Sequence, residues 1–194
     1  MFYGVILAGG ASSRMGEDKR LLSLHGQTLL ERAEALLEAA GAEFVLFSGA
    51  QVEGRACIAD THAGNGPPGA VLSVLEHVRE HYGLDSVNLL FVPVDMPLLS
   101  EATLKLLLDA SVNAAACHFE NQVFPCTMKA TPDLYMYLKE LFTEGSELGG
   151  KRSMRGILTW LQSKVAPTEE IAELEFLNVN TPEDWRRLLQ VQRL

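Results

Sequence analysis

The sequence predicts an α/β domain in which a mostly parallel sheet is covered by helices on both faces. Short apolar segments of strand length alternate with amphipathic segments of helix length along most of the 194 residues, which is the pattern of parallel α/β folds. A hydrophobic fraction of 47% with 21% charged residues is ordinary for a globular protein. Because this length suits one well-buried domain and no repeat or linker interrupts it, residues 1–194 are predicted to form a single domain.

The first half of the chain contains four predicted strands. They are the apolar segments 3–7, 43–49, 56–60 and 87–95. The last of these is too short for a helix and rich in strand-forming residues, so it is predicted to lie in the centre of the sheet. Helices are predicted over residues 28–41, where Thr28 and Glu31 form a capping box, and over residues 70–82, after a loop at 62–69.

The second half of the chain is less regular. Helices are predicted around residues 101–110, from Thr131 onward, at 153–163 and at 181–192. Two further strands, 113–120 and 123–130, flank the pair Asn121 and Gln122, which is typical of a hairpin turn and makes the sheet mixed. A last short strand is predicted at residues 175–180.

The overall charge argues against some classes of partner. A net charge of -9 disfavours a nucleic-acid or anionic-membrane surface, because both require a basic face. Cys57, Cys117 and Cys126 are widely spaced and form no C-x-x-C pair, which favours reduced thiols in a cytosolic protein. No segment has the pattern of a signal peptide or a membrane span, so a cytoplasmic location is expected.

The segment "LAGGASSRMGEDK", residues 7–19, directly follows the first predicted strand. It matches neither the Walker A loop nor the glycine fingerprint of dinucleotide-binding folds. Its possible anion-binding groups are two adjacent glycines, two serines and two cations, namely Gly9, Gly10, Ser12, Ser13, Arg14 and Lys19. Since open α/β sheets bind ligands at the carboxyl ends of their strands, the segment predicts a phosphate-binding loop. The alternative is a glycine turn followed by a solvated basic segment.

Two carboxylates follow predicted strands in the same way. Asp95 ends the central strand, and a carboxylate facing bound phosphates is what a Mg²⁺ site requires. Asp60 ends the third strand, and each of the two could instead be a turn residue or a helix cap. Asn178 and Asn180 lie at the end of the last predicted strand, where asparagine is either a turn residue or a neutral oxygen ligand.

Three segments together carry a family resemblance. "LAGGASSRMGEDK", "DMPLL" and "NVNTPED" resemble the molybdenum cofactor guanylyltransferases, within the wider nucleotidyltransferase superfamily, and they span the chain. The resemblance implies a Rossmann-like three-layer α/β/α sandwich with a mostly parallel, mixed central sheet. It implies transfer of GMP from Mg-GTP to the terminal phosphate of molybdopterin, or of its molybdenum-loaded form, with release of pyrophosphate. Mn²⁺ would be a substitute for Mg²⁺, and proteins that donate or accept the molybdenum cofactor would be partners.

The resemblance also implies roles for individual residues. The nucleotide site would contain Leu7, Ala8, Gly9, Gly10, Lys19, Asp60 and Asp95. Arg14 and Lys19 would neutralise the phosphates as catalytic residues. Asp95, the third expected catalytic residue, would bind Mg²⁺, with Asn180 as a second metal ligand by analogy with the sugar-phosphate relatives. The cytidylyl-transferring relatives have a different tetrapeptide in place of "LAGG", which favours guanine.

The chain also departs from the family pattern. The middle loop reads "GPPGA", with Pro68 in place of the usual leucine, which puts base contacts there in doubt. No motif identifies the pterin site. Asn178 and the basic residues Lys151, Arg152 and Arg155 of "KRSMR" are the candidates for holding that anionic substrate, and a solvated helix start is the alternative for the basic group.

Other functional classes remain as alternatives. "HVREH", from His77 to His81, matches the pattern of one zinc protease class, although no third ligand is evident. A second alternative is a protein that binds nucleotides without catalysing a reaction. Such a protein would not need Lys19, Asp95 and Asn180 together. The main alternative is the same chemistry with CTP or with another phosphorylated acceptor, such as a sugar phosphate.

Overall fold

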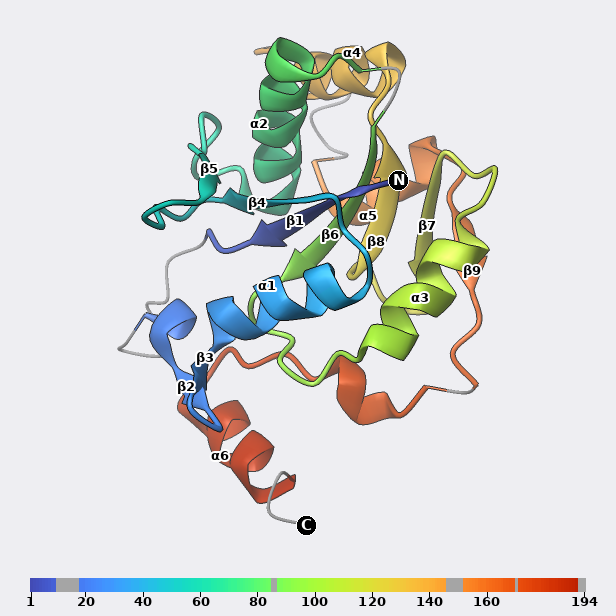
Figure 1. Ribbon diagram of the computed structural model, residues 1–194. Coiled ribbons are helices and arrows are strands. Elements are labelled where there is room, and N and C mark those ends of the chain that lie inside the picture. Colours follow the sequence, from blue (N-terminus) through green and yellow to red (C-terminus); the bar gives the residue numbers. More distant parts are fainter. Residues whose placement is uncertain (10–17, 85–86, 146–151, 170, 192–194) are drawn as a thin grey trace.

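The computed structural model describes residues 1–9, 18–84, 87–145, 152–169 and 171–191. Its centre is a seven-stranded sheet with the strand order β5-β4-β1-β6-β8-β7-β9 (Figure 1). The strands are β1 (Tyr3–Leu7), β4 (Phe44–Ser48), β5 (Ala56–Ile58), β6 (Asn88–Pro93), β7 (Ala116–Phe119), β8 (Cys126–Lys129) and β9 (Lys164–Ala166). Strand β8 runs antiparallel to both of its neighbours, and the other pairs are parallel, so the predicted mostly parallel, mixed sheet is confirmed.

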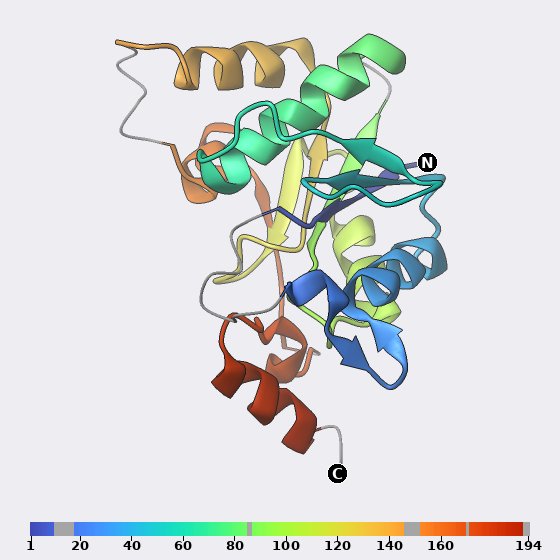
Figure 2. The same ribbon diagram turned by 90° about the vertical axis from the view of Figure 1, so that its left-hand side faces the viewer.

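Helices cover both faces of the sheet and complete the predicted three-layer sandwich (Figure 2). Helices α1 (Leu29–Ala39) and α3 (Glu101–Ala110) contact each other on one face. On the other face α2 (Gly66–His81) contacts α4 (Pro132–Leu141) and α5 (Met154–Trp160). Strands β1 and β6 are buried between these layers, which explains why their sequences are continuous apolar runs rather than alternating ones.

The local signals in the sequence account for most element boundaries. The Thr28 hydroxyl accepts a hydrogen bond from the Glu31 amide, and the Glu31 carboxylate accepts one from the Thr28 amide, so the predicted capping box opens α1. The predicted hairpin is confirmed by the antiparallel pairing of β7 with β8, and Asn121 adopts φ 60° in the turn between them. Asparagine tolerates this left-handed conformation better than most residues do.

Four element predictions were wrong or incomplete. The predicted last strand does not form, because Glu173–Phe176 is a 3₁₀ helix and the Val179 amide donates to the Asp95 carbonyl instead of joining a strand ladder. The predicted loop at 62–69 is shorter, since Pro67 and Pro68 occupy the first turn of α2, where a missing amide proton costs nothing. Strand β9 and the small hairpin of β2 (Ser23–Leu24) and β3 (Gln27–Thr28) were not predicted.

Three smaller features complete the fold. The 3₁₀ helix η1 (Lys19–Leu21) precedes β2, and α6 (Pro182–Val191) extends below the sheet near the C-terminus (Figures 1 and 2). Cys57, Cys117 and Cys126 are free thiols, and burial raises the pKa of Cys126. Within the described ranges, none of the helices is long and apolar enough to cross a membrane.

Candidate functional site

A pocket lies at the carboxyl ends of β1 and β6. It is lined by Leu7, Ala8, Gly9, Lys19, Arg20, Pro67, Pro93, Val94, Asp95, Phe124 and Asn180. Six of these residues were predicted as site residues from the sequence, namely Leu7, Ala8, Gly9, Lys19, Asp95 and Asn180. Leu7, Ala8, Gly9 and Asp95 come together because the two central strands are parallel and end side by side, with Leu7 opposite Pro93. Lys19 and Asn180 reach the same place from the 3₁₀ helix Lys19–Leu21 and from the segment before α6.

The end of β1 is held firmly from both sides. The Ala8 amide donates to the Ser48 carbonyl over 2.9 Å, and the Val94 amide donates to the Leu7 carbonyl over 3.1 Å. These bonds fix the direction in which the chain leaves the sheet toward the predicted phosphate-binding loop. Gly9 is therefore presented at a defined position at the strand end.

Gly9 packs backbone to backbone against Gly49, the residue that follows β4. A Cβ atom on Gly49 would lie 2.6 Å from the Gly9 Cα atom, and Gly49 also has φ 76°. Real Cβ contacts are never that short, so only glycine fits at position 49. The close approach places the start of the loop directly against the neighbouring strand end.

Gly49→Ala is expected to lower the Tm by about 5–10 °C, since the new methyl group must push Gly9 away and also strain the backbone. Gly54→Ala is the matched control, because Gly54 has φ 71° but open space around it. Its Tm should fall by only about 2–4 °C. Differential scanning calorimetry of both variants gives the two Tm values. Equal decreases in Tm would show that the close approach of Gly49 to Gly9 contributes nothing to stability.

The most notable contact in the pocket joins three distant segments of the chain. The Lys19 ammonium lies 2.6 Å from the Asn180 side-chain oxygen and 3.4 Å from an oxygen of the Asp95 carboxylate. The side chains of Lys19 and Asp95 are 16% and 21% exposed, so this ion pair is partly shielded from water. Asp95 does not cap α3, because the Ser100 hydroxyl has that role.

The electrostatics of Asp95 favour a bound cation. Burial raises the pKa of the Asp95 carboxyl above its ordinary value, and the nearby Lys19 ammonium offsets this only in part. A carboxylate and an amide oxygen already converge on one positive charge at this point. Oxygen donors of these two types are what Mg²⁺ binds in proteins, so the residues present fit such a metal ion.

Asn180 is held in place by the start of α6. One oxygen of the Asp184 carboxylate accepts hydrogen bonds from the amides of Asn180 and Thr181, over 3.0 and 2.8 Å. The Thr181 hydroxyl in turn accepts a bond from the Asp184 amide over 3.2 Å. The motif "NTPED" therefore fixes the backbone from which the Asn180 side chain reaches Lys19.

This arrangement predicts a pH dependence. The hydrogen bond from Thr181 lowers the pKa of Asp184 below its ordinary value of 3.8. A lowered pKa in the folded state means that Asp184 stabilises the protein above pH 3.8, and that this contribution is lost as the pH falls through the folded-state pKa. Urea unfolding of the wild type and Asp184→Asn should therefore differ at pH 7 and converge below that pKa. A difference that stays constant with pH would contradict this.

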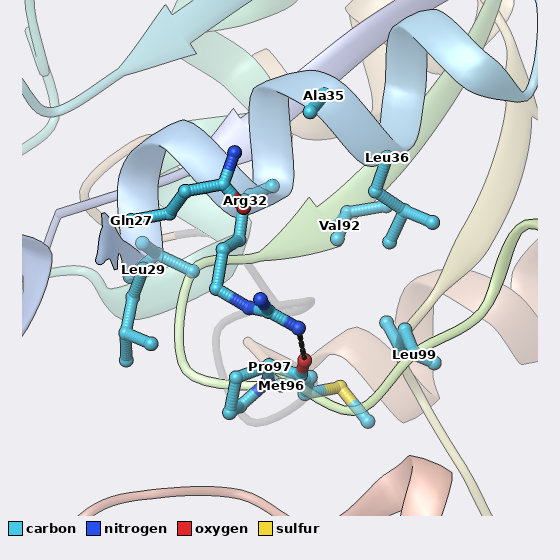
Figure 3. A pocket seen from close by; sticks show the side chains of 11 residues that line it. Gln27, Leu29, Arg32, Ala35, Leu36, Val92, Met96, Pro97 and Leu99 are labelled. Carbon is cyan, nitrogen blue, oxygen red and sulfur yellow. Dashed lines mark hydrogen bonds between the residues drawn. The ribbon is translucent and has the colours of Figure 1, made fainter. Parts of the chain in front are cut away.

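A second pocket lies beside the first, between α1 and the loop that follows Asp95 (Figure 3). The Arg32 side chain crosses it and donates from its terminal nitrogen to the Pro97 carbonyl over 3.3 Å. Apolar side chains, including Leu29, Leu36 and Met96, form most of the remaining wall. The arginine thus ties the loop that carries Asp95 to helix α1.

Other predicted site residues lie elsewhere. Asp60 accepts hydrogen bonds from the His62 amide and the Ser73 hydroxyl, which anchor its loop to α2, and it does not line the pocket. The Arg152 guanidinium donates to the Leu141 carbonyl over 2.9 Å. Arg155 and Asn178 line two further pockets. Gly10, Arg14 and Lys151 lie outside the described residues.

Several pocket residues were not predicted as site residues. Arg20 is adjacent to the basic loop, and two of its nitrogens donate to Asp18, which lowers the pKa of that carboxyl. Pro67 belongs to the "GPPGA" segment. The position of this segment in the chain, which matches the middle loop of the family pattern, could have indicated that Pro67 lies at the site. Phe124 comes from the connection between β7 and β8. Nothing in its local sequence indicated that this connection would reach the ends of β1 and β6.

The protease-like motif does not form a zinc protease site in the described residues. His77 and His81 stack on α2 with ring centroids 4.1 Å apart. No group of three or more histidine, cysteine, aspartate or glutamate side chains is placed to hold a metal ion anywhere in the described part of the chain.

Comparisons with known proteins identify similar chains. A family model described as a MobA-like NTP transferase domain matches residues 4–165. The molybdenum cofactor guanylyltransferase of Xanthomonas euvesicatoria pv. vesicatoria is 41% identical over 186 residues, which cover 96% of this chain and 93% of that protein.

Two solved structures share the fold. The molybdopterin-guanine dinucleotide biosynthesis protein A of Archaeoglobus fulgidus superposes with a TM-score of 0.73 at 19% identity, covering 99% of each chain. A protein of Mycobacterium tuberculosis in complex with manganese gives a TM-score of 0.65 at 18% identity, covering 97% of this chain and 98% of that one.

Proposed function

Because the chain belongs to the family of MobA-like NTP transferases, we propose that it transfers GMP from GTP to the terminal phosphate of molybdopterin. The chain is a nucleotidyltransferase related to the molybdenum cofactor guanylyltransferases. The products of the proposed reaction are the guanine dinucleotide form of the cofactor and pyrophosphate. The observation that carries the proposal is the convergence of Lys19, Asp95 and Asn180 at the end of the central strands.

In the proposed reaction an oxygen of the acceptor phosphate attacks the α-phosphorus of GTP. A new bond forms between that oxygen and the α-phosphorus, and the bond from the α-phosphorus to the oxygen that bridges to the β-phosphorus breaks. Pyrophosphate leaves with the electron pair of the broken bond. The acceptor phosphate is already an anion near neutral pH, so no general base is required, and the enzyme has to supply orientation and positive charge.

The described residues suit these two tasks. The end of β1 and Gly9 are fixed by backbone hydrogen bonds and close packing, so the following loop starts from a rigid base for the phosphates. The Lys19 ammonium supplies positive charge in a partly buried place, where electrostatic stabilisation is stronger than in open water. We propose that Arg14, in the same loop, adds a second cation.

Asp95 and Asn180 are the proposed ligands of a divalent metal ion, with Mg²⁺ as the physiological ion and Mn²⁺ as a substitute. Such an ion, when bound, would act as a Lewis acid on the α-phosphate and the leaving group. The manganese complex of the structural relative supports the choice of Mn²⁺ as a probe. Asp95 is held for this role by its backbone, whose carbonyl accepts from the Val179 amide over 2.8 Å.

We further propose that Leu7 and Ala8 bind the guanine and ribose together with Pro67, which lines the same pocket. Asp60 follows the edge strand β5, beyond β4, and does not line this pocket, so we propose that it contacts the nucleotide only from the periphery of the site. Asn178 is two residues from Asn180 and lines a separate pocket, and we propose that it contacts the acceptor there. Arg152 and Arg155 do not line the pocket that contains Asp95, and any contact they make with the acceptor would lie away from the reacting phosphates.

The test is to incubate the protein with molybdopterin, Mg²⁺ and each nucleoside triphosphate in turn, and to identify the dinucleotide by mass. GTP is expected to be the efficient donor. Comparable turnover with CTP or ATP would contradict the proposed base specificity. Turnover only with a sugar phosphate as the acceptor would contradict the proposed substrate.

A further inference from the structure

Helix α2 carries two histidines at the end far from the nucleotide pocket. Its first turn contains Pro67, which lines that pocket, whereas His77 and His81 lie ten and fourteen residues further along. At a rise of 1.5 Å per residue they are about 15 and 21 Å from Pro67 along the helix axis. Any ligand that they bind would therefore be separate from the site around Asp95.

The two imidazole rings are already arranged side by side. Their centroids are 4.1 Å apart and their planes differ by 25°. Both rings also contact the Tyr82 ring, at centroid distances of 6.2 and 6.1 Å, which restricts their orientations. Residues four apart on a helix face the same direction, so both rings can reach a common ligand.

A hydrogen bond to a backbone carbonyl selects the tautomer of His81. Its Nδ1 atom lies 2.8 Å from the His77 carbonyl oxygen. Because a carbonyl only accepts hydrogen bonds, Nδ1 carries the proton, and in the neutral ring the lone pair lies on Nε2. Histidines that bind metals in proteins are typically oriented in this way, with the other ring nitrogen donating to a carbonyl or carboxylate.

We propose that His77 and His81 form a two-ligand site for a divalent late-transition-metal ion such as Ni²⁺, Zn²⁺ or Cu²⁺, with water completing the coordination. Imidazole nitrogens prefer these ions, whereas Mg²⁺ prefers oxygen ligands. Bond lengths of about 2.0–2.1 Å place two nitrogens of a tetrahedral site roughly 3.3 Å apart. The rings are stacked with their planes 25° apart, so both must turn about their side-chain torsions before the lone pairs, which lie in the ring planes, converge on one ion.

The surroundings of the pair favour a cation. Both histidines lie in the last turns of α2, where the helix carbonyls carry partial negative charge. Glu80, on the same helix, is exposed beside them and adds a carboxylate near the ion. His81 is exposed, so the site is open to metal ions in solution without any rearrangement of the core.

The test is to titrate chelator-treated protein with Ni²⁺ and with Zn²⁺ and to measure binding by isothermal titration calorimetry. These two ions are used because Cu²⁺ would oxidise the thiols. One equivalent is expected to bind to the wild type, also in the presence of excess Mg²⁺. His77→Gln and His81→Gln should each weaken binding by at least about 10²-fold, since one ligand and the chelate advantage are lost.

His25→Asn is the matched control, because asparagine tolerates the φ of 54° at that turn. It should bind Ni²⁺ as the wild type does. Paramagnetic Ni²⁺ should also broaden the NMR signals of the His77 and His81 rings before those of His25, His62 and His118. The proposal is overturned if the two glutamine variants bind normally, if His25→Asn loses binding equally, or if half an equivalent binds and joins two copies.

Discussion

Asp95→Asn is expected to reduce turnover with Mg-GTP by at least about 10³-fold while leaving the fold intact. The substitution keeps the size of the side chain but removes the negative charge that we propose holds the metal ion beside the phosphates. Part of the activity should return at raised Mg²⁺ or Mn²⁺, because the main defect is weaker metal binding. Burial already disfavours the charged form of Asp95, so a neutral amide there should change the Tm by only a few degrees.

The measurement is a titration of wild type and variant with metal at saturating GTP. Asp109→Asn is the control, since Asp109 is an exposed carboxylate on α3. It should show the metal dependence of the wild type. If Asp95→Asn shows that same dependence, Asp95 is a turn residue and the proposed site lacks its carboxylate ligand for the metal ion.

Lys19→Met is expected to lower turnover by about 10²- to 10³-fold and, at the same time, to strengthen metal binding to the nucleotide-free protein. The first effect follows from the loss of a positioned positive charge near the phosphates. The second follows from the contacts of the Lys19 ammonium, which lies against the oxygens of both proposed metal ligands, Asp95 and Asn180. Removal of that cation leaves the carboxylate without its ion-pair partner.

The second effect is measured as the affinity for Mn²⁺ in the absence of nucleotide, with electron paramagnetic resonance as the readout. Lys105→Met is the control, because Lys105 pairs with Glu101 on the exposed face of α3. It should leave both turnover and Mn²⁺ affinity unchanged. If Lys19→Met turns over normally but melts several degrees lower, Lys19 has a structural role and the proposed position of the triphosphate is wrong.

The sequence predicted the parts of the site that depend on strand ends. Continuous apolar runs identified the two central strands, and parallel strands necessarily present their carboxyl ends at one edge. Leu7, Gly9 and Asp95 were therefore predicted to lie together, and the structure places them in one pocket. Asn180 was found through its motif, although the strand predicted before it does not form.

What the sequence did not predict depends on contacts between distant segments. Phe124 reaches the pocket because its connection is placed by the pairing of β6 with β8, which local patterns do not encode. Strand β9 has three residues, which is too short for any periodicity to be visible. Asp60 accepts from the His62 amide and lies within hydrogen-bond distance of the Ser73 hydroxyl, and the contact with Ser73 exists only once α2 packs on the sheet.

The central claim is that the pocket around Lys19, Asp95 and Asn180 moves the α-phosphate of GTP onto molybdopterin. The most direct measurement uses GTP labelled either at the α-phosphate or at the γ-phosphate, with wild type and Asp95→Asn under single-turnover conditions. The account predicts that the α-label enters the dinucleotide and the γ-label enters pyrophosphate with wild type, and that neither moves at a comparable rate with Asp95→Asn. Transfer of the γ-label to the acceptor, or equal rates for the two proteins, would contradict it.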